Sequence, residues 1–290
     1  MILESVVIVG FALLLDFFIG DPKTKYHPTA WMGKLIALLV PFTKSNSAKK
    51  ELIGGVLIVG IIVATVCTVL VVLDIGISLL TIDIVSLVVS IAVGSILLKT
   101  TIAIRGMQIH ALAVFDAVEK GDLDSARNHL SMIVKRDTKH LDKNHILSAV
   151  LESVSENTVD GVTGPLFYYA IFGLPGAFVY RVINTIDSMI GYKTTLFKNV
   201  GWFGAKCDTV LNYLPSRLTA LVMILGALIL GYNWKESLYI MKRDSGKLES
   251  PNAGFPMAAL AGALGTRLEK MNYYTIGNGS IEFTKSHIIS

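Results

Sequence analysis

An uncharged apolar run from Leu52 to Leu73 constrains the fold of this chain more than any other feature. A helix rises about 1.5 Å per residue, so a helix over this run crosses the hydrocarbon core of a bilayer, which is roughly 30 Å thick. A second run, Ile84–Leu98, follows after a short connection without Lys or Arg, and the two runs predict a transmembrane hairpin. The opening segment, Ile2–Ile19, is also long enough to cross. It lacks the basic start and the small-residue cleavage site of a secretory signal, so we expect a third, retained span.

The composition also indicates a membrane protein. Hydrophobic residues make up 52% of the chain and charged residues 17%, against roughly 25% charged in soluble domains. The mean hydropathy of +0.60 excludes a disordered chain. The cysteine count of 2 excludes a disulfide scaffold, and the net charge of +4 is too small for the dense cationic surface that binds nucleic acid. We therefore expect an integral membrane protein in contact with the lipid bilayer and without a nucleic-acid partner.

The later apolar segments are interrupted or short. Residues 162–179 are broken by prolines and glycines, among them Gly173, and residues 218–231 and 256–265 are short for a full crossing. Lipid cannot satisfy backbone groups that such breaks leave unpaired, so segments of this kind usually line a cavity or pack inside protein. We expect broken or re-entrant segments here.

Lysines and arginines concentrate in residues 20–51 and 99–161 and are absent from the tip of the predicted hairpin. By the positive-inside rule these two stretches face the cytoplasm and the tip faces out. Within the second stretch, Gly121 and Asp122 separate two segments with helical spacing of apolar residues, which predicts a cytoplasmic helical hairpin.

The predicted fold class is therefore all-α: a polytopic membrane helix bundle with a cytoplasmic helical hairpin, broken or re-entrant segments and about four or five crossings. We expect one integral membrane domain over residues 1–290. Its predicted parts are three spans with the cytoplasmic loop 20–51 (1–98), a cytoplasmic helical region (99–161), broken membrane segments with site loops (162–268) and a polar tail (269–290).

The strongest local signal is a run of carboxylates that leads into an apolar segment. Glu152, Glu156 and Asp160 recur at i, i+4 and i+8, so a helix places them along one stripe. Like charges at this spacing repel, and burial raises the cost. Oxygen ligands with Asn157 nearby suit Mg²⁺ better than zinc. A solvated helix face that precedes a membrane segment is the alternative interpretation.

Part of this run is repeated further along the chain. Asn157-Thr158-Val159-Asp160 has a counterpart in Asn184-Thr185-Ile186-Asp187, and a related pair, Asp208 and Asn212, precedes Arg217. All three pairs border apolar segments, where ionisable groups are candidates for function. Helix capping and turn formation, which Asn and Asp perform routinely, is the alternative.

Further candidates lie near the two ends of the chain. Asp16 falls inside the first apolar segment and is followed by Asp21 and His27. An unpaired carboxylate there costs roughly 2.5–3.5 kcal/mol, so we expect Asp16 to have a partner. Ser250-Pro251-Asn252-Ala253-Gly254 predicts a helix start, which caps the helix or binds an anion such as a nucleotide. The chain has no G-x-x-x-x-G-K-[ST] loop, so any use of ATP does without the standard phosphate cradle.

These motifs follow one another in a fixed order. They read D-x-x-x-G-D-P, H-P, R-D-T, E-S-V-x-E-N-T-V-D-G, I-N-T-x-D-S-M-x-G-Y-K, D-x-x-x-N-x-x-P-x-R-L-T and S-P-N-A-G. From about Asp16 to Leu268 the chain resembles the membrane-bound cobalamin biosynthesis family called adenosylcobinamide-phosphate synthase, or cobinamide synthase.

The resemblance implies an ATP-dependent amide ligase with Mg²⁺. Its substrates are adenosylcobyric acid and (R)-1-aminopropan-2-ol or its O-phosphate, its product is adenosylcobinamide or the phosphate, and other late corrinoid-pathway enzymes are further partners. It also implies a multi-pass protein of the cell membrane with its active site on the cytoplasmic side.

As our own hypothesis, the candidate residues take the following roles. Glu152, Glu156 and Asp160 hold Mg²⁺–ATP, aided by Asp187 and Asp208. Arg136, Arg217 and Lys193 contact phosphate or the substrate carboxylate, and Asp16, Asp21 and His27 bind the amine or act as base. The expected catalytic residues are Glu156, Asp160, Asp187, Asp208 and His27, and the asparagines expected to contact substrate or ATP are Asn157, Asn184, Asn212 and Asn252.

Two other functions share these features. Acids at the membrane and segments broken by Pro and Gly also make up the sites of ion-coupled transporters. A membrane lipid phosphotransferase would likewise use Mg²⁺-binding acids, but its D-x-x-D-G-x-x-A-R run is absent, since Asp160-Gly161 continues as Val162-Thr163.

Overall fold

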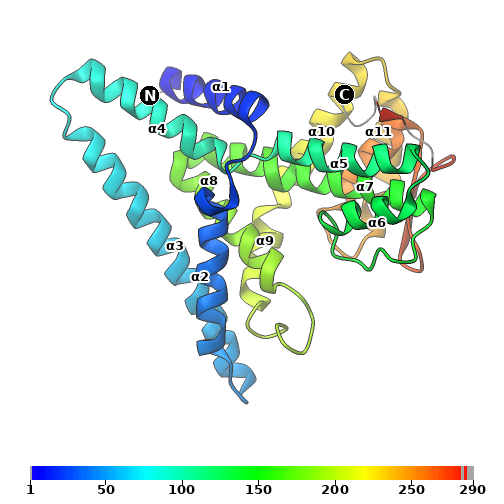
Figure 1. Cartoon of the computed structure of the whole chain (residues 1–290), viewed down its shortest axis with the longest axis horizontal. Coiled ribbons are helices and arrows are strands. Elements are labelled where there is room, and N and C mark those ends of the chain that lie inside the picture. The colour runs from blue at the N-terminus through cyan, green and yellow to red at the C-terminus, as the bar shows by residue number, and fades with distance from the viewer. Residues whose placement is uncertain (1, 282–283, 286–290) are drawn as a thin grey trace. The chain divides into compact units, whose positions relative to one another are not determined.

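The computed structural model describes residues 2–281 and 284–285. Regular secondary structure in these residues is helical except for one two-stranded sheet (Figure 1). This confirms the predicted all-α class. The contacts divide the chain into two compact units, the first made of Met1–Ala103 with Asp160–Leu211 and the second of Ile104–Val159 with Asn212–Ser290. Each unit thus combines two stretches that are far apart in the sequence.

Among the described residues, 4 helical stretches are long and apolar enough to cross a membrane. The number rises to 5 if α9 (Trp202–Leu211) and α10 (Tyr213–Ile229) together form one broken span. This number agrees with the predicted crossings. The stretches are Ile2–Ile19, Ala48–Ser78, Asp83–Glu119 and Lys143–Ile190.

The first unit is built from long apolar helices. They are α1 (Ile2–Ile19), α2 (Pro28–Thr43), α3 (Ala48–Ser78), α4 (Asp83–Lys99), α8 (Gly164–Ile190) and α9, with a short 3-10 turn η1 (Thr24–Tyr26) before α2. Large apolar side chains such as Ile53, Leu57 and Ile61 remain exposed along α3. A helix that is apolar on all sides and still exposed is suited to lipid rather than to water.

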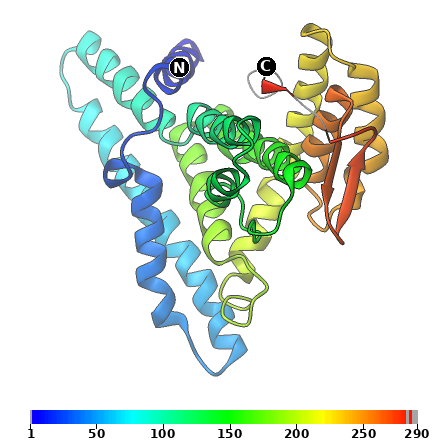
Figure 2. The same ribbon diagram turned by 45° about the vertical axis from the view of Figure 1, so that its right-hand side comes forward.

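Helices α3 and α4 form the predicted hairpin, which turns at residues 79–82 (Figures 1 and 2). The hydroxyl of Ser86 donates to the carbonyl of Ile77 across the turn. Helix α1 packs along α4, and the two approach closely because a Cβ at Gly94 would lie 2.9 Å from Ile8 Cδ1.

Helix α8 reverses direction within its own length. Gly173 has φ 64° and ψ −156°, a conformation open essentially to glycine alone. Beyond it the chain doubles back, so the ring of Tyr180 stacks on that of Tyr168 at 5.4 Å between centroids. A Cβ at Gly176 would collide with the carbonyl oxygen of Tyr168. The predicted break in residues 162–179 is therefore a helical hairpin, and its two ends meet.

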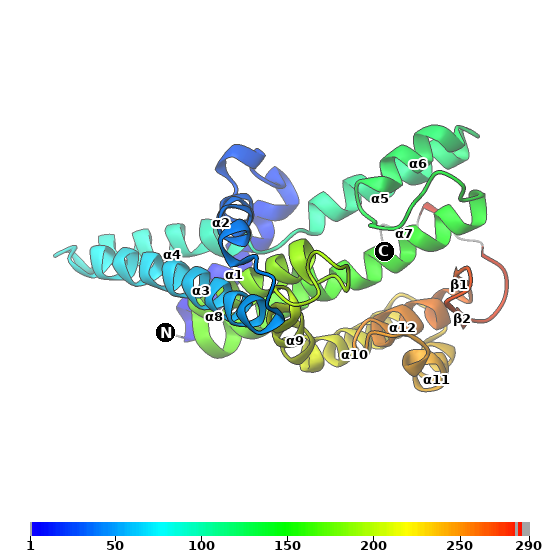
Figure 3. The same cartoon turned by 90° about the horizontal axis from the view of Figure 1, so that it is seen from below.

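The second unit surrounds a short helix of small residues. Its helices are α5 (Ile104–Glu119), α6 (Leu123–Ser131), α7 (Lys143–Thr158), α10, α11 (Trp234–Asp244) and α12 (Gly254–Leu264), with a 3-10 turn η3 (Ser245–Lys247). Helices α5 and α6 form the predicted helical hairpin, with Gly121 at φ 76° and Asp122 as the cap of α6. Helix α12 contacts α7, α10 and α11 (Figure 3), and its Ala258, Ala259 and Ala261 are fully buried.

The C-terminal part of the second unit differs from the predicted polar tail. Strands β1 (Arg267–Lys270) and β2 (Tyr274–Gly277) pair in an antiparallel hairpin that packs on α12 (Figure 2). The buried carboxylate of Asp244 accepts from the backbone N–H of Gly277 at 2.8 Å and forms 2.7 Å ion pairs with Arg243 and Lys247. Strands of 4 residues are too short to show a recognisable alternation of apolar and polar residues.

Candidate functional site

Two acidic side chains of the first unit share one lysine at the end of α4. Asp16 is fully buried in α1, and its Oδ1 lies 3.5 Å from the Nζ of Lys99. The same Nζ lies 2.7 Å from Asp21 Oδ1. Lys99 is itself 5% exposed, so one buried ammonium compensates two carboxylates. Asp16 thus has the partner that its position requires.

His27 connects this pair to the start of α2. Its Nδ1 accepts the backbone N–H of Thr29 at 3.2 Å and so caps the helix ahead of Pro28. In a neutral ring the proton is then on Nε2, which lies 3.8 Å from Asp21 Oδ1. Burial by itself raises the pKa of Asp21, but the hydrogen bonds and charges of His27 and Lys99 outweigh burial and lower this pKa to about 2.

A second polar group forms where the two ends of α8 meet. Asp160 lies in a π-helical turn, η2 (Val159–Thr163), a distortion that often marks functional sites. Its carboxylate accepts from Asn184 and lies 3.4 Å from the hydroxyl of Tyr180. The guanidinium of Arg181 donates to the Asp160 carbonyl at 3.1 Å and lies 3.4 Å from Asn184 Oδ1. The two repeated motifs of the sequence therefore meet because α8 folds back at Gly173.

The two polar groups of the first unit share one electrostatic environment. The charge of Asp21 acts on Arg181, and the charge of Asp187 acts on Asp160. We call these residues the first-unit cluster: Asp16, Asp21, His27, Lys99, Asp160, Arg181, Asn184 and Asp187. Its carboxylates outnumber its permanent cations, so it is suited to receive a positively charged group.

The cluster contains two cations that the sequence analysis did not single out. Lys99 ends an apolar run and was counted only among the basic residues of a cytoplasmic stretch. Arg181 is the lone charge between Asp160 and Asp187, and that isolation in an apolar segment was the available signal. The other predicted residues of this unit lie elsewhere in it, Lys193 in the loop after α8 and Asp208 on α9.

In the second unit, Glu152 lies in a fully formed network of protein donors. Its Oε1 accepts from Ser148 at 2.7 Å, and its Oε2 accepts from Tyr274 at 2.7 Å and from Arg136. Burial, followed by the charge of Glu152, raises the pKa of the Tyr274 hydroxyl, which keeps its proton and donates it. Ser148 also accepts the backbone N–H of Glu269 at 2.7 Å. This Glu152 network fastens the β-hairpin to α7.

The predicted metal ligands do not form a cage. No group of three His, Cys, Asp or Glu side chains within residues 2–281 and 284–285 could hold a metal ion, so Glu152, Glu156 and Asp160 are not gathered around one ion as we expected. Glu152 is occupied by its network, whereas Glu156 is exposed on α7. Asn157 donates to the carbonyl of Ser153 at 2.8 Å.

Arg217 and Asn252, both predicted, meet in the second unit. The guanidinium of Arg217 lies 3.5 Å from the ring centroid of Tyr213 and 4.2 Å from that of Phe255. One of its nitrogens is 3.4 Å from Asn252 Oδ1. Asn212 is buried at the N-cap position of α10, where its side chain forms no capping hydrogen bond. Aromatic rings on the guanidinium orient it, as anion-binding arginines require.

The chain matches the model of one protein family, described as "CobD/Cbib protein", over residues 9–287. A probable cobalamin biosynthesis protein CobD of Methanothermobacter thermautotrophicus is 40% identical over 276 residues, which cover 95% of this chain and 88% of the relative. A protein with the same description from Methanocaldococcus jannaschii is 38% identical over 283 residues, 97% of this chain and 91% of the relative.

A bacterial relative is similar to the same extent. The cobalamin biosynthesis protein CobD of Leptospira interrogans is 40% identical over 271 residues, 92% of this chain and 83% of the relative. No solved structure matches the chain significantly.

Proposed function

The chain belongs to the CobD/Cbib protein family, and from this premise we propose that it acts in cobalamin biosynthesis as a membrane-bound amide ligase. Its substrates are adenosylcobyric acid and (R)-1-aminopropan-2-ol or the O-phosphate of that amine, and ATP drives the reaction. The product is adenosylcobinamide or its phosphate. The observation that carries the proposal is the first-unit cluster, which joins carboxylates, a histidine and two cations in a member of this family.

The reaction proceeds in two steps that balance. A carboxylate oxygen of the corrinoid forms a bond to the γ-phosphorus of ATP, the bond between that phosphorus and the β–γ bridging oxygen breaks, and ADP leaves. The amine nitrogen then forms a bond to the acyl carbon, the acyl–oxygen bond breaks, and phosphate leaves. The amine arrives as an ammonium and loses two protons, one to a base as the amine attacks and one that leaves with the phosphate, so the site needs an anion to bind the ammonium and a base.

Asp21 suits the first of these tasks. A carboxyl with a pKa of about 2 is ionised at neutral pH and is a poor base, so we assign it to binding the ammonium. Histidine is the side-chain type that exchanges a proton near neutral pH. In the neutral ring His27 accepts the Thr29 N–H at Nδ1 and carries its proton on Nε2, 3.8 Å from Asp21, so it acts as the base by releasing the Thr29 N–H and taking the proton on Nδ1. Lys99 positions Asp21 and keeps it ionised, and Asp16 in turn orients Lys99.

Asp160 and Arg181 suit the phosphate side of the reaction. Arg181 is placed by the Asp160 carbonyl and by Asn184, and a guanidinium stabilises charge on a transferring phosphoryl group. In the second unit, Arg217 is oriented by two aromatic rings and binds an anionic group of the substrate or of ATP. Arg136 is committed to Glu152, so we give it no role in the reaction.

Mg²⁺ fits this site only as a companion of ATP. Proteins usually bind it through one or two carboxylates together with substrate phosphates, so a cage of three acids is not needed. Asp160 and Asp187 from the predicted set, both in the first unit, would supply such ligands. When bound, the ion neutralises charge on the phosphates. We propose that the reaction takes place at the cytoplasmic side of the cell membrane, as the distribution of Lys and Arg predicts.

A direct test incubates the detergent-purified protein with adenosylcobyric acid, ATP, Mg²⁺ and each form of the amine, and follows products by mass spectrometry. We expect a corrinoid with the mass of acid plus amine minus water, formed together with ADP and phosphate. The variant Asp21→Asn should lose most of this product, whereas Asp124→Asn, which alters an exposed carboxylate in the second unit, should keep it. Ion flux through reconstituted vesicles without a corrinoid product would instead favour a transporter.

A further inference from the structure

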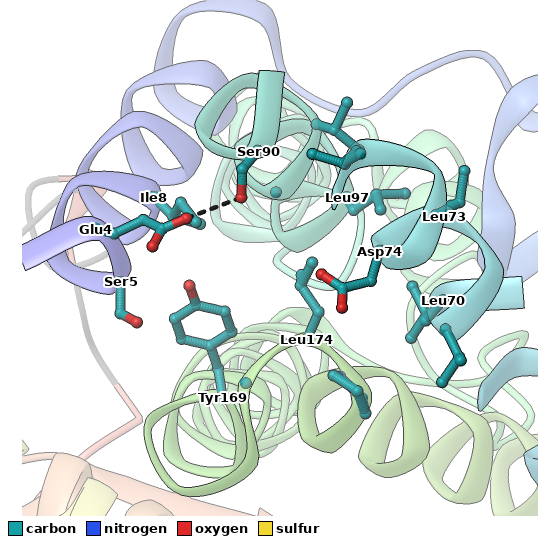
Figure 4. A pocket seen from close by; sticks show the side chains of 16 residues that line it. Glu4, Ser5, Ile8, Leu70, Leu73, Asp74, Ser90, Leu97, Tyr169 and Leu174 are labelled. Atoms are coloured by element: carbon teal, nitrogen blue, oxygen red, sulfur yellow. Dashed lines mark hydrogen bonds between the residues drawn. The ribbon is translucent and has the colours of Figure 1, made fainter. Parts of the chain in front are cut away.

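The first unit contains a cavity between α1, α3, α4 and α8 that the proposed reaction does not use. Its volume is about 370 Å³. Apolar side chains such as Ile8, Leu70 and Leu174 make up much of its wall, and Figure 4 shows the carboxylates of Glu4 and Asp74 pointing into it from different sides. None of the residues that line it is Lys, Arg or His.

Both carboxylates lie near the ends of apolar helices of membrane-spanning length, Glu4 in the first turn of α1. The hydroxyl of Ser90 donates to Glu4 Oε1 at 2.8 Å, and Ser90 is about 10 Å along α4 from Asp83 by helix rise. Asp74 lies in the last turns of the apolar helix α3 and is exposed, so a ligand in the cavity can reach it. Two carboxylates that line one largely apolar cavity at the ends of such helices attract a cation, and ionisable residues at these positions are candidates for function.

The chemistry of the wall restricts the kind of cation. Two carboxylates are few for a bare divalent ion, and no three candidate ligands gather in the described residues. The apolar wall instead favours a cation that carries hydrocarbon. Tyr169 is the only aromatic residue in the wall, so the cavity lacks the aromatic cage that binds quaternary ammonium groups. Carboxylates and the hydroxyls of Ser5 and Ser90 accept N–H donors, which a primary ammonium supplies.

We propose that this cavity binds a primary alkylammonium group, with Glu4 and Asp74 as its anionic partners. The group can belong to a free amine or to the headgroup of an ethanolamine lipid, since both present the same –CH₂–NH₃⁺ chemistry. The proposal goes beyond the amide ligase reaction and does not rest on it, because none of the residues of the cavity belongs to the first-unit cluster.

The test uses the full chain in nanodiscs of phosphatidylglycerol, a lipid whose headgroup has no amine. We titrate n-butylammonium and tetramethylammonium and measure binding by saturation-transfer NMR on the ligand. The variant Glu4→Gln with Asp74→Asn removes both charges while preserving shape, and the matched control Asp83→Asn removes a carboxylate of α4 outside the cavity. A second set of nanodiscs contains phosphatidylethanolamine, and native mass spectrometry counts the lipids that remain bound.

We expect n-butylammonium to bind and the double variant to weaken it by about tenfold or more, as loss of charge-assisted hydrogen bonds requires, with the control unchanged. Retention of phosphatidylethanolamine that the double variant abolishes would also support the proposal and identify the lipid as the source. Equal binding of tetramethylammonium, equal binding by the double variant, or no binding of amine and lipid would overturn it. If the double variant does not fold, two other measurements test the proposal. They are competition between n-butylammonium and tetramethylammonium on the unaltered protein, and binding of n-butylammonium to each single variant. Amide formation should persist in these variants, so the result is independent of the ligase assay.

Discussion

In the second unit, the buried carboxylate of Glu152 accepts from Arg136, Ser148 and Tyr274, and both of its oxygens are occupied. In the first unit, the single ammonium of Lys99 serves both Asp16 and Asp21. Both arrangements bury acids. Glu152 has a protein donor on each of its oxygens, whereas Asp16 and Asp21 share one ammonium. A buried carboxylate whose oxygens all accept hydrogen bonds from the protein stabilises the fold, because losing any one donor leaves a buried polar group without a hydrogen bond.

A carboxylate that shares its cation can accept another one at lower cost. Asp21 is 34% exposed at its side chain, whereas Glu152 is 4% exposed. A substrate ammonium can therefore reach Asp21 from solvent, but it cannot reach Glu152 without opening the β-hairpin. We therefore expect the first-unit cluster to bind substrate and the Glu152 network to hold the β-hairpin on α7, and variants of each test this expectation.

The largest effect is expected from Lys99→Met. Removing one member of a buried ion pair leaves uncompensated charge and costs about 3–5 kcal/mol of unfolding free energy. Amide formation should be lost with it, since Asp21 loses the group that orients it. Denaturant unfolding in detergent and the product assay measure the two effects.

The matched control combines Lys99→Met with Asp16→Asn. Because the uncharged amide no longer needs compensation in the interior, the double variant should regain part of the lost stability. Strict additivity of the two single changes would mean that Lys99 and Asp16 do not interact, and the account of a shared ammonium would fail.

Asp21→Asn should affect the reaction more than the fold. Loss of the anion that holds the ammonium is expected to lower kcat/KM by about 10²-fold, while the unfolding free energy changes by less than about 1 kcal/mol because Lys99 keeps Asp16 as partner. Steady-state kinetics with amine as the varied substrate measure the first quantity. Unchanged kcat/KM would remove Asp21 from the proposed site.

The spans could be predicted because apolar length is a local property. The run Leu52–Leu73 lies within α3, and Ile2–Ile19 coincides with α1. The meeting of Asp160 with Asn184 could be suspected only from the repeated motif. This contact depends on the chain reversal at Gly173, and the sign of φ at a glycine cannot be predicted from the residue type.

The failures have a physical cause as well. Glu152 and Glu156 follow helical spacing with Asp160, yet spacing says nothing about what faces the stripe. Tyr274, 122 positions away in the sequence, donates to Glu152, and helical spacing contains no sign of such a partner. Lys99 could not be identified for the same reason, since its partner Asp21 lies 78 positions earlier in the sequence and Asp16 lies on α1, outside the predicted hairpin.

Tyr274→Phe tests the structural role of the Glu152 network. It removes one donor from Glu152 Oε2, and the net loss of one hydrogen bond to a charged group is about 1.5–3 kcal/mol. Arg136 still compensates the charge, so we expect the lower end of this range. The rate of amide formation per folded molecule should not change, because the hydroxyl touches no part of the proposed site. A rate loss of tenfold or more in a folded sample would assign the Glu152 network to the reaction.

The smallest effect concerns pH and compares the unaltered protein with Asp21→Asn. The folded pKa of Asp21, about 2, lies below its ordinary value of 3.8, so the ionised carboxylate stabilises the folded state. This contribution is complete above the unfolded pKa and is lost as the pH falls through about 4 to about 2. Because the side chain is 34% exposed, water screens it and we expect a difference of a few tenths of a kcal/mol up to about 1 kcal/mol. Unfolding curves of both proteins between pH 6 and pH 2, a range of about four units around these pKa values, should converge at the acid end, since other carboxylates cancel in the difference. If the difference in unfolding free energy between the two proteins grew toward low pH, the sign of the linkage would be reversed, and Lys99 and His27 would not be the groups that keep Asp21 ionised.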